Sequence, residues 1–350
     1  MPNRIIMRSF GKYKPTNLVS NEQMVEKMLA AGAKTNSGAP LTADWVANRV
    51  LIYNRGYVRD VPEEDPQTHE ILPVENISDI AYIAGDQALV KADVSWEEVD
   101  LVIVASSSDE YIHPPAACLV INKAGIKTGP IAFDISAACT GAIYAISVAR
   151  AMMLQNKWRY ALVIGADIMH RTLDFSDINS QLWGDGAGAV LLENISTREK
   201  RGILCCLGGS EPDKVERAKA TGTGTHLDSE GNKEKQNVFL QGSDVQEFVI
   251  RTLIEAIPKT AKAAKIKLQD VGLIIGHQAN GRAFDRAARV LKVPKENFYI
   301  NIYNIGNTST ASTLIAACDA EEEGLFHEGC DVIFVAYGGG LTWGSLAHRF

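Results

Sequence analysis

The sequence predicts an α/β fold built from two similar halves. Short runs rich in Val, Ile and Leu alternate along the chain with stretches of helical character, a pattern typical of sheets flanked by helices. Most of these runs end in glycine or small polar residues, as strands that lead into loops do. In chain order, we expect strands at 100–108, 131–136, 160–167, 187–193, 271–278, 298–306, 331–340 and 345–350.

The two groups of four strands repeat one order. The sequence ISAACTGA at 135–142 corresponds to IGNTSTAS at 305–312, and each runs into an apolar helix. In the same register, VIGAD at 163–167 corresponds to VAYGGG at 335–340. Two halves that each bury one sheet face would pack together, so their strand ends could share one site.

The boundaries of the halves follow from composition. Residues 210–236 are charged, contain glycine and are poor in apolar side chains, which indicates a surface segment. We therefore expect one half at 1–200, a connector at 201–238 and the second half at 239–350. A second acidic, proline-bearing loop is expected at 57–73.

The overall composition excludes several classes of protein. With 46% hydrophobic and 22% charged residues among 350, the chain has the profile of an ordinary globular protein. A net charge of −7 argues against a nucleic-acid-binding protein, because such proteins carry an excess of positive charge. No apolar run reaches the roughly 18 residues that span a bilayer, and the first residues have no signal-peptide core. We expect a cytoplasmic protein with no membrane partner.

Cys139 occupies a position that favours a reactive thiol. It joins a strand-like run to the helix-like run 142–153, which is apolar around nearly its whole circumference and is therefore expected to be buried. The first turn of such a helix has unpaired N–H groups and partial positive charge, which favour a thiolate. Cysteine is also among the most buried residue types and often only packs, so both interpretations stay open at this point.

The other cysteines are expected to pack in the core. The chain has no CxxC pair, and a long cytosolic chain does not normally use disulfides, so neither disulfides nor a zinc site is expected. These five residues are Cys118, Cys205, Cys206, Cys318 and Cys330.

If the halves are equivalent, three strand tips converge. They bring together the thiol of Cys139, the imidazole of His277 and the carboxamide of Asn307. The glycines at 338–340 add bare backbone, whose N–H groups can approach a substrate oxygen without hindrance. Each feature alone has a structural explanation, since a polar residue after a glycine is often only a helix cap. Their joint occurrence at equivalent strand ends favours a catalytic site.

These motifs resemble those of the β-ketoacyl-acyl-carrier-protein synthase III family, a group of thiolase-fold condensing enzymes. The resemblance covers most of the chain from about residue 100 onward, in order and spacing. It implies a five-layered αβαβα pseudo-dimer of two duplicated halves, assembled as a homodimer. The matching segments are AACTG around Cys139, GDGAGAVLL at 184–192, GHQANGR at 276–282, GNTSTAS at 306–312 and GGGLTWGSLAHRF at 338–350.

The resemblance also implies a reaction. Cys139 would take an acyl group from an acyl-CoA, and His277 with Asn307 would complete the catalytic triad. Backbone N–H groups of Cys139 and Gly339 would form the oxyanion hole. A malonyl-acyl carrier protein would then lose carbon dioxide and attack the acyl group, giving the β-ketoacyl thioester that initiates fatty acid or related biosynthesis. No metal or redox cofactor is expected, and coenzyme A enters only as a thioester substrate.

Two further matches concern binding. Trp45 and Arg49 fall where the family has a Trp-x-x-x-Arg motif at the adenine end of coenzyme A, although Trp45 could equally pack in the core. Arg282, Arg286 and Arg289 are spaced to share one helix face, which suits an acidic carrier protein. A solvated helix face would show the same pattern.

Three departures from the family concern the substrate. Ile178 stands near the place of a family arginine that borders the coenzyme A adenine, and Tyr337 replaces a frequent phenylalanine. His113 stands where housekeeping members usually have an apolar residue that reaches the partner's acyl pocket. An alternative is therefore a specialised relative that uses a non-acetyl primer, in secondary metabolism or in head-to-head acyl condensation.

Other enzyme classes fit the motifs less well. A thiolase would need a second cysteine at the position of Tyr337. A papain-like cysteine hydrolase, a distant alternative, also has Cys, His and Asn in this order, but its C-G-[SA]-C-[WY] sequence is missing.

Overall fold

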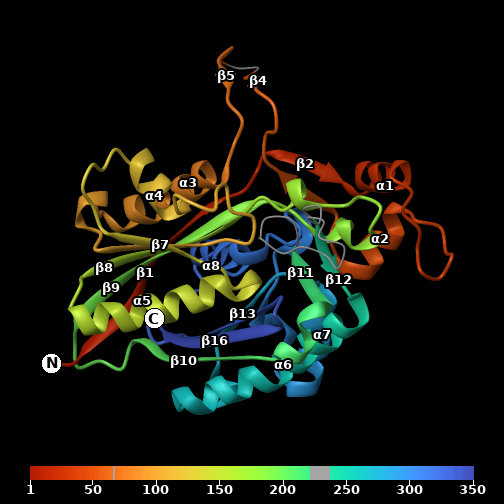
Figure 1. Cartoon of the computed structure of the whole chain (residues 1–350). Helices are drawn as coiled ribbons and strands as arrows, with labels where there is room; N and C mark the ends of the chain where they lie inside the picture. Colours follow the sequence, from red (N-terminus) through yellow and green to blue (C-terminus); the bar gives the residue numbers. More distant parts are fainter. Residues whose placement is uncertain (66–67, 221–236) are drawn as a thin grey trace.

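The computed structural model describes residues 1–65, 68–220 and 237–350. Five layers alternate through the molecule (Figure 1): an outer helix layer, a sheet, two central helices, a second sheet and another outer helix layer. This arrangement confirms the αβαβα fold class that the motifs implied. Most of the buried apolar side chains lie between these layers, and a smaller cluster lies around α1 and α2.

The first sheet has five strands in the order β1-β9-β8-β6-β7. The three strands β8, β6 and β7 are parallel, whereas β9 runs antiparallel to β8 and β1 antiparallel to β9. The carboxyl ends of the parallel strands therefore meet at one edge, and β7 is left at the side of the sheet. The bounds are β1 Asn3–Tyr13, β6 Leu101–Ala105, β7 Ile131–Ile135, β8 Tyr160–Asp167 and β9 Gly186–Ser196.

The second sheet repeats the first strand for strand. Its order is β10-β16-β15-β13-β14, with β15, β13 and β14 parallel and the other two antiparallel to their neighbours. The bounds are β10 Gly202–Ser210, β13 Leu273–Gly276, β14 Phe298–Tyr299, β15 Asp331–Gly338 and β16 Thr342–Arg349.

The helices pack on both faces of each sheet. Helices α3 and α4 cover the outer face of the first sheet, α6 and α7 cover that of the second, and α5 and α8 lie between the sheets (Figure 1). Helix α8 is buried at all but its last two residues, because sheet or helix surrounds it on every side. The bounds are α1 Asn21–Ala30, α2 Ala43–Val50, α3 Ile77–Ala92, α4 Ala116–Lys123, α5 Gly141–Asn156, α6 Gly242–Ala264, α7 Gly281–Leu291 and α8 Ser312–Glu322.

Three strands differ from the sequence-based expectation. We did not predict β1 or β10, since edge strands need a less continuous apolar run than central ones. Strand β10 lies inside the segment 201–238 that we took as a connector, so the second sheet begins earlier than expected. The strand expected at 298–306 ends at Tyr299, and the backbone N–H of Asn301 donates to the side chain of Gln278 instead of to a neighbouring strand.

Smaller elements surround the body. Three two-stranded antiparallel sheets pair β2 with β3, β4 with β5, and β11 with β12. The acidic loop expected at 57–73 contains the β4–β5 hairpin, which projects from the body in Figure 1, and its residues 66–67 lie outside the described residues. Residues 221–236 of the expected connector also lie outside them. The bounds are β2 Asn17–Ser20, β3 Asn54–Tyr57, β4 Glu63–Glu64, β5 Ile71–Leu72, β11 Ala218–Ala220 and β12 Val238–Leu240.

In the part of the chain that the structure describes, no helix is both long enough and apolar enough to cross a membrane.

Candidate active site

Cys139 lies at the turn between β7 and α5. The chain leaves the sheet through a short 3₁₀ turn, Ala138–Thr140, before the helix begins at Gly141. Ala138 has a φ of +47°, a left-handed conformation that costs a non-glycine residue free energy and that often marks functional sites. Cys139 is 9% exposed, and its thiol borders a cavity at the start of the central helix.

His277 follows the end of β13 in the second half. Its backbone N–H donates to the carbonyl of Val335 at 2.8 Å, which continues the sheet pairing for one more residue. The hydroxyl of Tyr337 donates to the carbonyl oxygen of His277 at 2.9 Å, and the two rings meet edge to face with centroids 5.1 Å apart. The imidazole is therefore held by the neighbouring strand β15.

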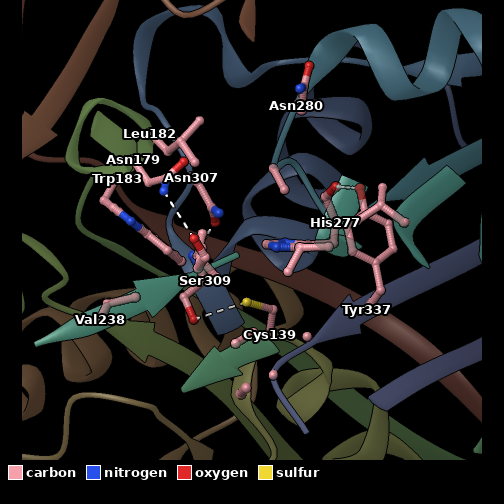
Figure 2. A pocket seen from close by; sticks show the side chains of 18 of the residues that line it. Cys139, Asn179, Leu182, Trp183, Val238, His277, Asn280, Asn307, Ser309 and Tyr337 are labelled. Carbon is pink, nitrogen blue, oxygen red and sulfur yellow. Dashed lines mark hydrogen bonds between the residues drawn. The ribbon is translucent and has the colours of Figure 1, made fainter. Parts of the chain in front are cut away.

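The imidazole of His277 is neutral at physiological pH. Burial lowers its pKa to about 3, because the charged form would lose its hydration. Nδ1 contacts the hydroxyl of Ser312, and this hydroxyl accepts the N–H of Gln278 at 3.3 Å. The hydroxyl hydrogen is then available for Nδ1, which leaves the ring proton on Nε2. Figure 2 shows the ring reaching into the cavity from the side opposite Asn307.

Asn307 comes from the loop before α8. Its backbone N–H donates to the carbonyl of Leu182 at 2.8 Å, and its carbonyl accepts the N–H of Gly184 at 3.0 Å. These two hydrogen bonds anchor the loop to the first half. The side-chain oxygen accepts the N–H of Ser309 at 2.9 Å. This bond fixes the orientation of the carboxamide and leaves its NH₂ group as the donor on the cavity side.

The three side chains share one cavity of about 520 Å³. Cys139 comes from the first half and His277 and Asn307 from the second, so the structure brings together the residues that the repeat placed at equivalent strand tips (Figure 2). Gly338 and Gly339 also line the cavity. The cavity therefore contains a thiol nucleophile, two neutral hydrogen-bond donors and accessible backbone N–H groups. These groups are suited to acyl transfer and to the stabilisation of an oxyanion.

Glycine is required at position 338. A Cβ there would lie 2.7 Å from the backbone nitrogen of Cys139 and 3.3 Å from the Cβ of Ala138. No side chain fits in that space, so the end of β15 can pass directly over the N–H group of the nucleophile. This is a physical reason for the glycine run at 338–340.

A buried carboxylate, Asp167, joins the loops around the cavity, and the motifs did not reveal it. It ends β8 and accepts the N–H of Ser107 at 2.7 Å and the hydroxyl of Ser108 at 2.8 Å. From the second half it accepts the N–H of Thr310 at 3.0 Å and the hydroxyl of Thr310 at 2.7 Å. The signal was present, because Asp167 ends the VIGAD segment, but its partners are far away in sequence.

The predicted coenzyme A residues lie near the mouth of the cavity. Arg49 is exposed and lines the cavity, and its guanidinium lies 5.0 Å from the centre of the Trp45 ring. Trp45 is half-buried and packs against an apolar cluster, as its structural interpretation required. Both residues come from α2, whose last turn approaches α7.

The other predicted binding residues occupy different surroundings. Arg282, Arg286 and Arg289 are all exposed on α7, on one face of that helix. Tyr337 lines the cavity. His113 is exposed on the loop between β6 and α4 and is not among the described residues that line the cavity of its own chain. Ile178 begins the short 3₁₀ helix Ile178–Leu182, of which Asn179, Gln181 and Leu182 line the cavity.

Comparison with known proteins gives consistent matches. Residues 133–210 match the family model for 3-oxoacyl-[acyl-carrier-protein (ACP)] synthase III, and residues 261–350 match the model for its C-terminal part. The β-ketoacyl-[acyl-carrier-protein] synthase III of Clostridium perfringens is 36% identical over 339 residues, 96% of each chain. The crystal structure of 3-oxoacyl-[acyl-carrier-protein] synthase III from Aquifex aeolicus has a TM-score of 0.83 at 32% identity and covers 100% of both chains. The corresponding enzyme of Thermus thermophilus gives 0.84 at 27% identity, with 99% of each chain covered.

Fold, site and matches define the class of protein: this is an acyl-transferring condensing enzyme with the thiolase fold. Within that class, the chain belongs to the β-ketoacyl-acyl-carrier-protein synthase III family. The family inferred from the motifs is thereby confirmed. The individual roles of the site residues stay predictions.

The low pKa of His277 predicts a loss of stability in mild acid. The unfolded chain binds a proton at this histidine below about pH 6.5, whereas the folded chain does not until about pH 3. The free energy of unfolding therefore has its full value above about pH 6.5 and declines as the pH falls. Between pH 7 and pH 5, the decline that His277 causes is about 2 kcal/mol. Urea unfolding of His277→Gln at both pH values should show a decline smaller than that of the wild type by about this amount.

Two other histidines provide the comparison. His348 is equally buried, and burial also lowers its pKa to about 3. The loss of stability in acid that His348 contributes should therefore remain in the His277→Gln variant. His327→Gln, a change at an exposed histidine outside the cavity, controls for the substitution itself. An equal decline in His277→Gln and in the wild type would show that the ring is charged in the folded protein.

Proposed function

We propose that the protein catalyses a decarboxylative Claisen condensation that initiates fatty acid biosynthesis. An acyl group from an acyl-CoA passes to Cys139, and a malonyl thioester on an acyl carrier protein then attacks it to give a β-ketoacyl thioester. The observation that carries the proposal is the convergence of Cys139, His277 and Asn307 on one cavity, in a chain of this family. The proposed steps need no metal or redox cofactor.

The first step is acyl transfer to Cys139. The thiolate attacks the thioester carbonyl, and the tetrahedral oxyanion collapses with release of the coenzyme A thiolate, which takes up a proton from solvent. Backbone N–H groups of Cys139 and Gly339 are the proposed oxyanion donors. The absence of a side chain at Gly338, directly above the nitrogen of Cys139, supports this assignment because it leaves room for the substrate oxygen.

The second step is the decarboxylation of the malonyl group. The carbon–carbon bond breaks, carbon dioxide leaves, and the electron pair forms an enolate whose oxygen needs hydrogen-bond donors. Nε2–H of His277 and the NH₂ group of Asn307 are the proposed donors. Their other atoms are already bound, Nδ1 by Ser312 and Oδ1 by the N–H of Ser309, which supports this orientation. The enolate carbon then attacks the acyl carbonyl on Cys139.

The neutral His277 also separates this proposal from the cysteine hydrolase. A hydrolase of that type uses its imidazole to accept the thiol proton, which requires a basic ring. With a pKa of about 3, His277 is a poor proton acceptor but an unchanged hydrogen-bond donor. The low pKa of His277 therefore favours the condensing role.

Substrate and partner surfaces follow from the same cavity. We propose that Arg49 and Trp45 contact coenzyme A at the cavity mouth, and that Arg282, Arg286 and Arg289 attract the acidic carrier protein. The curated relatives are named as β-ketoacyl-[acyl-carrier-protein] synthases III, which supports a carrier-protein substrate here. A cytoplasmic location is proposed because these substrates are water-soluble.

We also propose a homodimer. Strand β7 lies at the side of the first sheet with Ile131 49% exposed, and the nearby loop exposes Tyr111 and Ile112. Pairing of two β7 edges would cover these apolar side chains. It would also carry His113 toward the partner's cavity, where its polar ring and Tyr337 would help to select a primer other than acetyl, as in a specialised member of the family.

Replacement of the nucleophile separates the two steps. Cys139→Ala should lose acyl transfer completely, while release of carbon dioxide from the malonyl thioester persists in part, because His277 and Asn307 remain. Intact-protein mass spectrometry after incubation with acyl-CoAs reads the first step, and trapped carbon dioxide reads the second. Cys118→Ala, which changes an exposed cysteine, is the matched control and should keep both. Acyl label on another residue, or a wild type that releases no carbon dioxide, would contradict the proposal.

Charge reversal on α7 tests the carrier-protein surface. Arg282→Glu should weaken use of the malonyl-carrier protein about tenfold at low salt, and the defect should shrink as salt rises, because screening weakens long-range attraction. Acylation of Cys139 by an acyl-CoA should change little. Steady-state kinetics over a salt series measure both, with the exposed Lys292→Glu at the end of the same helix as a control for net charge. Equal losses in the two half-reactions would assign Arg282 a structural role.

A further inference from the structure

The hydroxyl of Ser309 lies beside the sulfur of Cys139. Their Oγ and Sγ atoms are 3.5 Å apart, and Figure 2 shows the contact as a dashed line below Asn307. Both side chains are buried, with Ser309 only 2% exposed. The second neighbour of the Ser309 hydroxyl is the hydroxyl of Ser107, at 3.4 Å. The thiol from one half thus meets a hydroxyl from the other half.

Three hydrogen bonds hold the backbone around Ser309. Its φ of +50° is left-handed, which a serine adopts only where its surroundings impose it. Its own N–H donates to Asn307, and both the N–H and the hydroxyl of the next residue, Thr310, donate to Asp167. These bonds fix the backbone at Ser309, and from that backbone the hydroxyl contacts the sulfur of Cys139 and the hydroxyl of Ser107.

The surroundings of Cys139 otherwise oppose its ionisation. Burial raises the pKa of the thiol to about 12, and repulsion from Asp167 acts in the same direction, while the hydrogen bond with Ser309 and a backbone hydrogen bond at Cys139 lower it. Among the described residues, three titratable groups at the cavity provide no positive charge: His277 is neutral, Tyr337 has its pKa raised by burial, and Asp109 is an acid. Two cations, Arg49 and Lys219, also line the cavity. The reactive thiolate needs a donor, and the structure places one hydroxyl within reach of the sulfur.

We propose that Ser309 is a further catalytic residue, whose hydroxyl donates a hydrogen bond to the thiolate of Cys139. Ser107 donates in turn to the oxygen of Ser309, so that two hydroxyls in series stabilise the charge. When the thiol ionises, its proton leaves to water through the open cavity, and Ser309 keeps its own proton and directs it at the sulfur. The inference rests on the proposed function, in which Cys139 is the nucleophile.

The pH dependence of Cys139 alkylation tests this role. Ser309→Ala removes the hydroxyl but keeps Cβ and the backbone N–H that holds Asn307. Alkylation by iodoacetamide, followed for the Cys139 peptide by mass spectrometry, should move to higher pH by one to two units, because a hydrogen bond to a charged group is worth about that much. At a given pH below the midpoint, the reaction should be about tenfold slower or more. The exposed Cys118 of the same protein is the internal control and should react as before.

Two further variants sharpen the test. Ser309→Gly suits the positive φ and should show the same shift, so a folding defect peculiar to alanine cannot explain the result. Ser107→Ala should shift the profile in the same direction by less, since it acts on the sulfur only through Ser309. In Ser309→Ala, acylation by an acyl-CoA should fall at least about fivefold more than malonyl decarboxylation.

An alkylation profile in Ser309→Ala and Ser309→Gly that coincides with that of the wild type would overturn the inference. Equal losses of acylation and decarboxylation would do the same, because they would place Ser309 in the support of Asn307 alone. A wild-type protein that takes no acyl group on Cys139 would overturn the proposed function, and the alkylation profiles would still decide the contact between Ser309 and the sulfur.

Discussion

The hydrogen bonds to the buried carboxylate of Asp167 hold the two halves of the site together. Asp167 belongs to the first half, yet it accepts two bonds from Thr310 in the second half and two from Ser107 and Ser108 beside it. A fully buried acceptor that loses its donors pays a desolvation penalty of roughly 1–3 kcal/mol or more, so these loops cannot separate cheaply. Since Thr310 lies three residues from Asn307, the same bonds also anchor the loop that carries the carboxamide.

The hydrogen-bond donors proposed for this site are neutral. His277 is uncharged, Asn307 cannot be charged, and the N–H groups around Cys139 belong to the backbone. Such groups stabilise an oxyanion or an enolate without drawing in water, and they are already in place before charge develops. The same burial that makes the imidazole a poor base raises the pKa of the thiol, which is why the surroundings of the sulfur matter for its reactivity.

The sequence was informative wherever chemistry is local. The strand tips, the turn at Cys139 and the arginine face of α7 follow from short motifs, and the duplicated register placed His277 and Asn307 opposite the thiol. Asp167 and Ser309 were missed as site residues, because their partners lie 60 to 170 residues away in sequence. The edge strand β10 was missed for a related reason, since its pairing with the last strand β16 is long-range.

We propose that the two halves supply separable functions, a nucleophile from one and enolate donors from the other. Asn307→Ala tests it most directly, with acylation of Cys139 and condensation with the malonyl thioester measured on the same preparation. Acylation should remain close to that of the wild type, whereas condensation should fall about a hundredfold, the effect of losing one preorganised donor. Condensation at the wild-type rate, or acylation that falls as far as condensation, would contradict the account.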